Sequence, residues 1–190
     1  MTLQPVLIAI PDDSHLCPSK RRQRQREYAR MALRECAVLS GAPLEGYRQD
    51  DQDVPLPNEG FSWSVSHKRR WAAAVVSDRP VGIDIECLTP RRDGLFDMVG
   101  VEQEWRILGG RTWENFYRLF TAKEATLKAN GLGIGCLLEC RLVEALPDGG
   151  TTLEHQDRRW PIEYSPCPEH LAAVCGNGHP IQWRVAGSVE

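Results

Sequence analysis

Three carboxylates and a lysine make up the part of this sequence best suited to chemistry. Asp84 and Glu86 stand in a stretch that alternates apolar and acidic residues. Because a strand has a period of two, both side chains would lie on one face of it. Glu124 stands four residues before Lys128 in a stretch of helical composition, so these two would share a helix face. Carboxylates flanked by lysines suit a hard divalent cation bound to a phosphate, and this is the chemistry we expect.

Each of these segments also has an ordinary explanation. An acidic face on a half-exposed strand is common in antiparallel sheets. The pair Glu124 and Lys128 could be an exposed helical ion pair, which contributes about 0.2–0.5 kcal/mol. The two segments together, with Gly131, Gly133 and Gly135 just after the helix, are more specific than either one alone.

The elements that must position these residues can be predicted from the hydrophobic pattern and the turn residues. A strongly charged helix is expected from about Lys20 to Leu39, ended by Ser40 and Gly41. Residues 77–80 (Ser-Asp-Arg-Pro) are typical of a turn, so the apolar runs on either side of them are predicted to form a hairpin. The predicted strands cover 5–11, 61–66, 71–76 and 81–86, the predicted helices 20–39, 101–108 and 113–129, and short strands fill the remainder.

A faint internal repeat divides the chain in two. Residues 71–85 can be aligned with residues 171–185 so that the alanines and the proline coincide, and a predicted helix precedes each copy. The expected fold is therefore α+β, with two similar α/β halves, residues 1–87 and 88–190, related by a pseudo-two-fold axis. Arg184 and Ala186 fall opposite the two strand carboxylates, so we expect one active site rather than two.

Composition limits the class of protein and its compartment. A chain of 190 residues can form one or two compact domains, and a net charge of −3 argues against bulk affinity for nucleic acid. The seven cysteines are odd in number and form no CxxC pair, which favours reduced thiols in a cytosolic protein. The apolar run at 5–11 lacks a basic leader and is too short to cross a bilayer. We expect a soluble cytoplasmic protein without a membrane partner.

The helix predicted at 20–39 is unusually basic. Most of its cations are explained by a solvated face, although a nucleic-acid-binding helix is an alternative that predicts steeply salt-dependent binding. Arg30 and Arg34 lie four residues apart and so share one face. The basic residues of this segment are Lys20, Arg21, Arg22, Arg24, Arg26, Arg30 and Arg34.

Three blocks of the sequence resemble the signature blocks of phosphopantetheinyl transferases. They are Ser-Val-Ser-His at 64–67, Val-Gly-Ile-Asp-Ile-Glu at 81–86 and Phe-Thr-Ala-Lys-Glu-Ala-Thr-Leu-Lys-Ala-Asn-Gly at 120–131. Their order and spacing are similar to the larger, monomeric surfactin-type branch, in which two similar halves enclose one site. The resemblance runs from about residue 20 to the end of the second repeat.

The resemblance implies a reaction and a metal site. The 4′-phosphopantetheine group of coenzyme A would pass to a serine of an acyl or peptidyl carrier protein, with release of adenosine 3′,5′-bisphosphate. Asp84, Glu86 and Glu124 would hold Mg²⁺, which keeps several water and substrate ligands. Glu124 would also take the proton of the attacking serine, and Lys128 would stabilise the charge on the leaving nucleotide.

The resemblance also implies a binding site for coenzyme A. Ser66 and His67 would bind its 3′-phosphate, Arg30 and Arg34 would contribute from the basic helix, and Lys123 would join Lys128 on the phosphates. Which of Lys20, Arg21, Arg22 and Arg48 contacts the nucleotide is left open.

This chain departs from the family pattern at two places. Residues 53–55 (Asp-Val-Pro) replace a basic turn, and Phe120 stands where tryptophan is frequent. A module that binds coenzyme A or a carrier protein without catalysis is an alternative, and it would tolerate the loss of Glu124. The carrier protein, its pathway, the use of acylated coenzyme A and the choice between Mg²⁺ and Mn²⁺ are left open.

Overall fold

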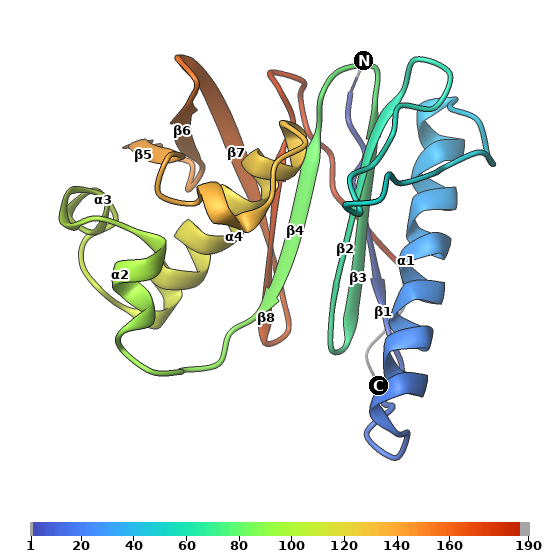
Figure 1. Ribbon diagram of the computed structural model, residues 1–190, viewed down its shortest axis with the longest axis horizontal. Helices are drawn as coiled ribbons and strands as arrows, with labels where there is room; N and C mark the ends of the chain where they lie inside the picture. Colours follow the sequence, from blue (N-terminus) through green and yellow to red (C-terminus); the bar gives the residue numbers. More distant parts are fainter. Residues whose placement is uncertain (1, 187–190) are drawn as a thin grey trace.

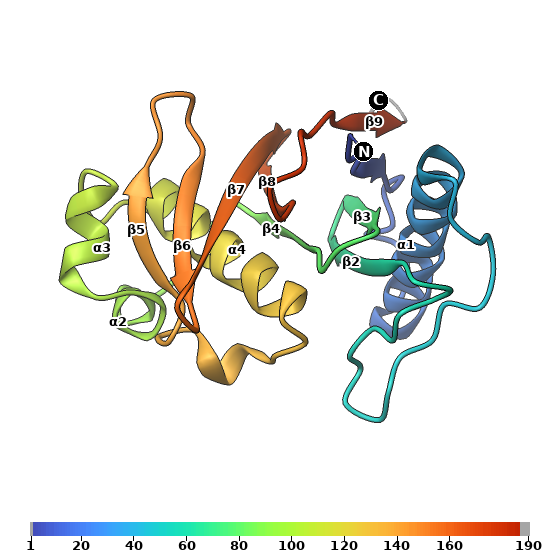
Figure 2. The same ribbon diagram turned by 90° about the horizontal axis from the view of Figure 1, so that it is seen from above.

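The computed structural model describes residues 2–186, so residue 1 and the last four residues of the predicted second half lie outside it. Two sheets stand side by side, with α1 covering the outer face of the first and the remaining helices grouped on the second (Figures 1 and 2). The helices are α1 (Pro18–Ser40), α2 (Leu95–Val99), α3 (Glu102–Ile107), α4 (Trp113–Ala129) and the 3₁₀ helix η1 (Ile134–Cys136). The strands are β1 (Val6–Ala9), β2 (Ser62–Lys68), β3 (Trp71–Ser77), β4 (Gly82–Cys87), β5 (Arg141–Ala145), β6 (Thr151–His155), β7 (Arg158–Cys167), β8 (His170–Cys175) and β9 (Arg184–Ala186).

The two sheets contain the same β-α-β-β unit. The first sheet has the order β2-β3-β1-β9 and the second β4-β8-β7-β6-β5. In the first, β1, α1, β2 and β3 follow one another along the chain, and β3 pairs with both β1 and β2. In the second, β4, α4, β7 and β8 correspond to them, because β8 pairs with both β4 and β7. The predicted α+β fold with two similar halves is confirmed.

The hairpin predicted for residues 71–86 is wrong. Both edges of β3 are occupied by β1 and β2, so β4 has no free edge there and pairs instead with β8 of the other sheet. The chain crosses between the sheets after β3, and it crosses back after β8, since β9 pairs with β1. The strand that carries Asp84 and Glu86 therefore lies in the second sheet, although residues 1–87 were predicted to form the first half.

Helix α1 packs a face of small residues on the first sheet. It begins with Pro18 at a position where the missing N–H costs no helical hydrogen bond. It ends at Gly41, whose left-handed φ of 66° lets its N–H bond back to the last turn. The buried face consists of Ala29, Ala32, Leu33, Cys36 and Ala37. Arg22, Arg26, Arg30 and Arg34 are left exposed, whereas Arg21 and Arg24 are half-buried.

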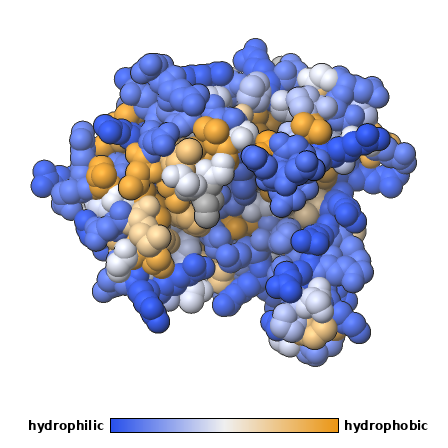
Figure 3. Space-filling view, in the orientation of Figure 1, coloured by the Kyte–Doolittle hydropathy of each residue, from blue (hydrophilic) through white to orange (hydrophobic). Residues whose placement is uncertain are grey.

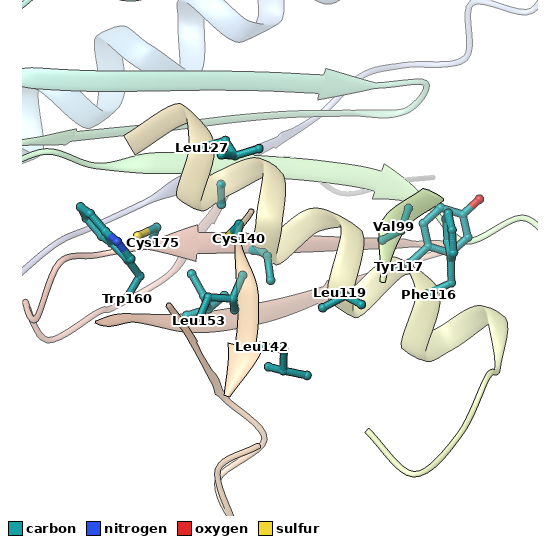
Figure 4. Close-up of a cluster of buried hydrophobic side chains, with 14 of the residues drawn as sticks. Val99, Phe116, Tyr117, Leu119, Leu127, Cys140, Leu142, Leu153, Trp160 and Cys175 are labelled. Carbon is teal, nitrogen blue, oxygen red and sulfur yellow. The ribbon is translucent and has the colours of Figure 1, made fainter. Parts of the chain in front are cut away.

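Helix α4 forms the core of the second half (Figure 4). The Thr112 hydroxyl caps its N-terminus by accepting a hydrogen bond from the Asn115 N–H, at 3.1 Å. Its apolar face packs on the second sheet and on α2, with Phe116, Leu119 and Leu127 all buried. None of the helices described within residues 2–186 is long and apolar enough to cross a membrane.

Gly82 brings β4 into direct backbone contact with α4. A Cβ atom at this position would overlap the carbonyl oxygen of Ala125 and lie 2.7 Å from the backbone nitrogen of Ala129. Because both neighbours are backbone atoms, they cannot turn aside. The glycine therefore sets the close distance between the strand and the helix that carry the predicted metal ligands.

Candidate active site

The candidate site lies where β4 of the second sheet runs beside β2 of the first (Figure 1). Two serine hydroxyls of β2 accept hydrogen bonds from the backbone of β4: Ser64 from the Ile83 N–H at 3.1 Å, and Ser66 from the Ile85 N–H at 3.3 Å. We call this contact between the sheets, made by Ser64 and Ser66 against Ile83 and Ile85, the serine seam.

Asp84 is the most buried carboxylate of the site, with 5% of its surface exposed. Its Oδ1 accepts hydrogen bonds from the Ser66 hydroxyl at 2.8 Å and from the Lys128 ammonium at 2.7 Å. Its Oδ2 is buried and has no hydrogen-bond partner among residues 2–186. A buried carboxylate oxygen left without a donor is costly in a protein interior, which favours a cation as its partner.

Glu86 is held from two directions by cations. The Lys68 ammonium lies 3.0 Å from its Oε1, and the Arg91 guanidinium lies 3.8 Å from its Oε2, too far for a hydrogen bond. Within the described chain, Oε2 is also buried without a hydrogen-bond donor. Burial, followed by the negative charge of Asp84, raises the pKa of Glu86, although Lys68 opposes this.

Glu124 faces these two carboxylates from α4. Burial raises the pKa of Glu124 to about 7, and the negative charges of Asp84 and Glu86 add to the effect, while Lys128 opposes it. The predicted partners are thus brought together: two carboxylates from β4, and a third with its lysine from α4. A carboxylate with a pKa near 7 is suited to accept a proton at neutral pH.

The donor atoms of this site fit a hard cation. Asp84 Oδ2 and Glu86 Oε2 are buried carboxylate oxygens without a hydrogen-bond donor among residues 2–186, and carboxylate oxygens are the ligand type that Mg²⁺ prefers. In the arrangement described for residues 2–186, however, no three His, Cys, Asp or Glu side chains converge closely enough to hold a metal. The Lys128 ammonium instead neutralises Asp84. The Mg²⁺ site therefore stays a prediction.

Lys123 lies on a different side of α4 from Glu124. Its side chain is fully buried, and its ammonium pairs with Glu104 at 2.8 Å and donates to the Val99 carbonyl at 2.8 Å. Consecutive helical residues point about 100° apart, so Lys123 points into the core beneath α2 and α3. This placement contradicts the predicted contact with a phosphate and leaves Lys128 as the lysine of the site.

His67 lies half-buried on β2, the strand that faces both β4 and α1. Burial, and after it the positive charges of Arg26 and Lys128, lowers the pKa of His67 and favours its neutral form. Arg26 was not among the predicted site residues, although it lies one turn before Arg30 and could have been found from the helical period.

The basic face of α1 is hollowed into an exposed groove of about 450 Å³. Arg30 lines this groove, and the charge of Arg26 on His67 places the groove near that histidine. The predicted contact of Arg30 with coenzyme A stays a prediction. Arg34 is exposed one turn further along and is not among the lining residues. The groove is lined by Ser19, Arg22, Gln23, Arg26, Glu27 and Arg30. Because three of these six side chains are arginines, the groove suits an anion.

The surface around the site differs between the two halves. Figure 3 shows apolar residues gathered over the half that carries α2 to α4, whereas the half that carries α1 is mostly hydrophilic. The polar half suits a nucleotide with several phosphates, while the apolar half suits an uncharged group or a protein surface.

Comparisons with known proteins identify the family. The model of the 4′-phosphopantetheinyl transferase superfamily matches residues 80–182, more than half of the chain. The 4′-phosphopantetheinyl transferase psf-1 of Bacillus pumilus is 32% identical over 122 residues, which cover 60% of this chain and 52% of the relative. A 4′-phosphopantetheinyl transferase of Bacillus subtilis is 30% identical over 132 residues, which cover 66% of this chain and 58% of the relative. The chain thus spans somewhat more than half the length of these two curated relatives.

A third relative aligns over more of the chain. The 4′-phosphopantetheinyl transferase Sfp of Bacillus subtilis strain 168 is 24% identical over 189 residues, which cover 88% of this chain and 84% of the relative. The matched family segment contains both Asp84 and Glu124. The resemblance to the surfactin-type branch is confirmed, and the chain belongs to the 4′-phosphopantetheinyl transferase superfamily.

Proposed function

We propose that this protein transfers the 4′-phosphopantetheine group of coenzyme A to a serine of an acyl or peptidyl carrier protein and releases adenosine 3′,5′-bisphosphate. The observation that supports the proposal is that Asp84 and Glu86 of β4 lie near enough to Glu124 of α4 for their charges to raise its pKa, inside the segment that matches the family. Asp84 and Glu86 each have a buried oxygen without a hydrogen-bond donor among residues 2–186, and the raised pKa values of Glu86 and Glu124 reflect burial and crowded negative charge that a divalent cation would neutralise.

Mg²⁺ would be held by the three carboxylates Asp84, Glu86 and Glu124, and when bound it would neutralise the pyrophosphate oxygens. Lys128 is already within 2.7 Å of Asp84 and would turn its ammonium to the phosphate once another cation neutralises that carboxylate. Its positive charge would stabilise the charge that develops on the leaving nucleotide.

The reaction itself is an in-line displacement at phosphorus. The serine oxygen of the carrier protein bonds to the β-phosphorus of coenzyme A, and the bond from that phosphorus to the oxygen bridging the two phosphates breaks. Glu124, whose pKa is about 7, accepts the serine proton. Most of the acceleration comes from positioning the two reactants and from neutralising charge.

The nucleotide would lie against the first half of the chain. A neutral His67 can donate one ring N–H to the 3′-phosphate, and Arg26 and Arg30 supply charge from the groove on α1. Lys123 does not belong to this set because it is buried against Glu104.

We also propose that the protein acts as a monomer in the cytoplasm. It is supported by the fact that the carboxylates, the lysine and the basic groove all come from one chain. All seven cysteines are free thiols, as expected for a reducing compartment.

The test is intact-mass spectrometry of an apo carrier protein incubated with this protein, Mg²⁺ and coenzyme A. We expect the mass of one phosphopantetheine to be added by the wild type and none by Glu124→Gln. Failure of the wild type with a panel of acyl and peptidyl carrier proteins, while coenzyme A still binds, would overturn the proposal in favour of a binding module.

The same assay tests the groove. Arg26→Ala should raise the KM for coenzyme A about tenfold, the effect of one lost charge-assisted phosphate contact. Arg34→Ala is the matched control, because it removes the same charge from the same helix outside the groove. Equal effects of the two variants would show that only the general charge of α1 matters.

A further inference from the structure

A pair of side chains joins the two segments in which the chain crosses between the sheets. The first crossing, residues 78–81, connects β3 to β4, and the second, residues 176–183, connects β8 to β9. The Nε2 of His179 in the second crossing lies 2.9 Å from Asp78 Oδ1 in the first. An ionised carboxylate only accepts hydrogen bonds, so Nε2 is the donor whether the imidazole is neutral or charged. We call this hydrogen bond between Asp78 and His179 the crossing latch.

Each end of the crossing latch belongs to a segment that is itself held in place. His179 has 8% of its surface exposed. The residue after it, Pro180, accepts a hydrogen bond from the Leu3 N–H at 2.8 Å, which ties the second crossing to the first half of the chain. At the other end, the Ser77 hydroxyl lies 3.4 Å from the same Asp78 oxygen. The latch therefore fixes two locally ordered segments relative to each other.

The internal repeat explains why the crossing latch is present once. When residues 71–85 are aligned with residues 171–185, Asp78 corresponds to Gly178 and His179 to Arg79. The latch thus joins neighbouring positions of the two copies, as expected for residues close to a pseudo-two-fold axis. Glycine has no side chain to pair, so the symmetry-related pair of Arg79 and Gly178 cannot form a second latch.

The crossing latch precedes the end of β4 that enters the contact between the sheets. Asp78 stands five residues before Ile83, whose N–H donates to the Ser64 hydroxyl across the serine seam at 3.1 Å. Within its own sheet β4 forms a backbone ladder with β8, whereas its seam with β2 is made by serine hydroxyls. Such a contact has fewer hydrogen bonds to break than a ladder, so it can open locally at a lower free energy.

We propose that the crossing latch holds the two halves at a fixed opening, and that its loss lets β4 and β2 separate more often at the serine seam. Asp84 and Glu86 lie on β4 and the basic groove lies on α1, so this opening would change the distance between the two parts of the candidate active site. The inference goes beyond the proposed function and does not depend on it, because the opening is a property of the protein without ligands.

The test is hydrogen–deuterium exchange of the full chain, read by mass spectrometry in the peptide that carries the Ile83 and Ile85 amides. Asp78→Ala and His179→Ala each remove one side of the latch. Asp78 is half exposed, so the bond is partly screened by water, and we expect this peptide to exchange about three- to tenfold faster in both variants. His179→Gln, which can present an amide N–H to Asp78, should restore slow exchange.

The matched control is Asp97→Ala, which breaks an ion pair of 2.8 Å with Arg111 inside the second half. It should leave the exchange of the β4 peptide unchanged. Peptides of α4 should also be unchanged in the latch variants, because the latch acts between the halves and not within one. Equal acceleration of β4 and α4 would show a general loss of stability and would overturn the inference.

Unchanged exchange of the β4 peptide in both folded latch variants would overturn it as well. Should the alanine variants fail to fold, Asp78→Asn takes their place. It keeps the shape of the side chain and removes the charge that strengthens the bond, so the β4 peptide should exchange about twofold faster or more; no acceleration would overturn the inference. A wild type that modifies no carrier protein while the latch variants open the seam would sink the proposed function and support the latch.

Discussion

Glu124 should make the metal-free protein less stable than a variant that lacks its charge. The pKa of this carboxyl is raised from 4.5 to about 7, first by burial and then by Asp84. The folded state therefore binds the proton more tightly than the unfolded chain, and stability falls as pH rises from about 4.5 through about 7. A shift of this size corresponds to roughly 3 kcal/mol when the carboxyl is fully ionised. Glu124→Gln keeps the shape of the side chain and removes this cost.

The measurement is thermal unfolding in a chelator at about pH 5 and about pH 8. The free energy of unfolding of Glu124→Gln relative to the wild type should grow by about 2–3 kcal/mol over that range, which is roughly 4–10 °C in Tm for a chain of this size. Glu144→Gln, which changes an exposed glutamate on β5, should show no such pH dependence. A Glu124→Gln protein no more stable than the wild type at about pH 8 would refute the view that burial and the neighbouring carboxylates raise the pKa of Glu124.

Three further substitutions test other parts of the site. Lys128→Met removes the ammonium that lies 2.7 Å from Asp84 and that lowers the pKa of Glu124. Without it the pKa of Glu124 should rise further, so the acid limb of the pH–rate profile should move to higher pH. An unmoved limb would count against this coupling. Gly82→Ala should cost about 3 kcal/mol or more in urea unfolding, because its Cβ would meet the backbone of α4. Gly94→Ala is its control and should change stability by less than ~0.5 kcal/mol, since its Cβ has no described heavy atom within 4 Å. Lys123→Met should cost about 3–5 kcal/mol by leaving a buried glutamate unpaired, yet leave the KM for coenzyme A unchanged; a raised KM would restore its predicted phosphate contact.

The local geometry of the site could be predicted because it depends on short periods. The strand period predicts that Asp84 and Glu86 lie on one face of their strand, and the helical period predicts that Glu124 and Lys128 lie on one face of their helix. The pairing of β4 could not be predicted, because an alternating pattern shows which side chains share a face and not which strand lies alongside. The internal repeat was the better guide, since the chain crosses between the sheets after β3 and again after β8.

The placement of Lys123 was within reach of sequence reasoning. It lies four residues after Leu119 and four before Leu127, both buried, so the helical period assigns it to the core face. Its position next to Glu124 in the sequence does not place it on the same face, because consecutive helical residues point about 100° apart. Its partner Glu104 comes from a separate short helix, and such a long-range pair leaves no pattern in the sequence.

The serine seam also explains why a duplicated fold would have one site. At the corresponding second crossing, β9 pairs with β1 through backbone hydrogen bonds, so no side-chain hydroxyl is needed between them. The residue aligned with Asp84 is Arg184, which donates to Gln4 at 2.9 Å on the exposed edge of the sheet. The first crossing instead leaves room for side chains between β2 and β4, and there the seam brings a carboxylate against a hydroxyl of the other sheet. We therefore expect the chemistry at the contact between β2 and β4, which is made by side chains. The backbone pairing of β1 with β9 holds the two halves together.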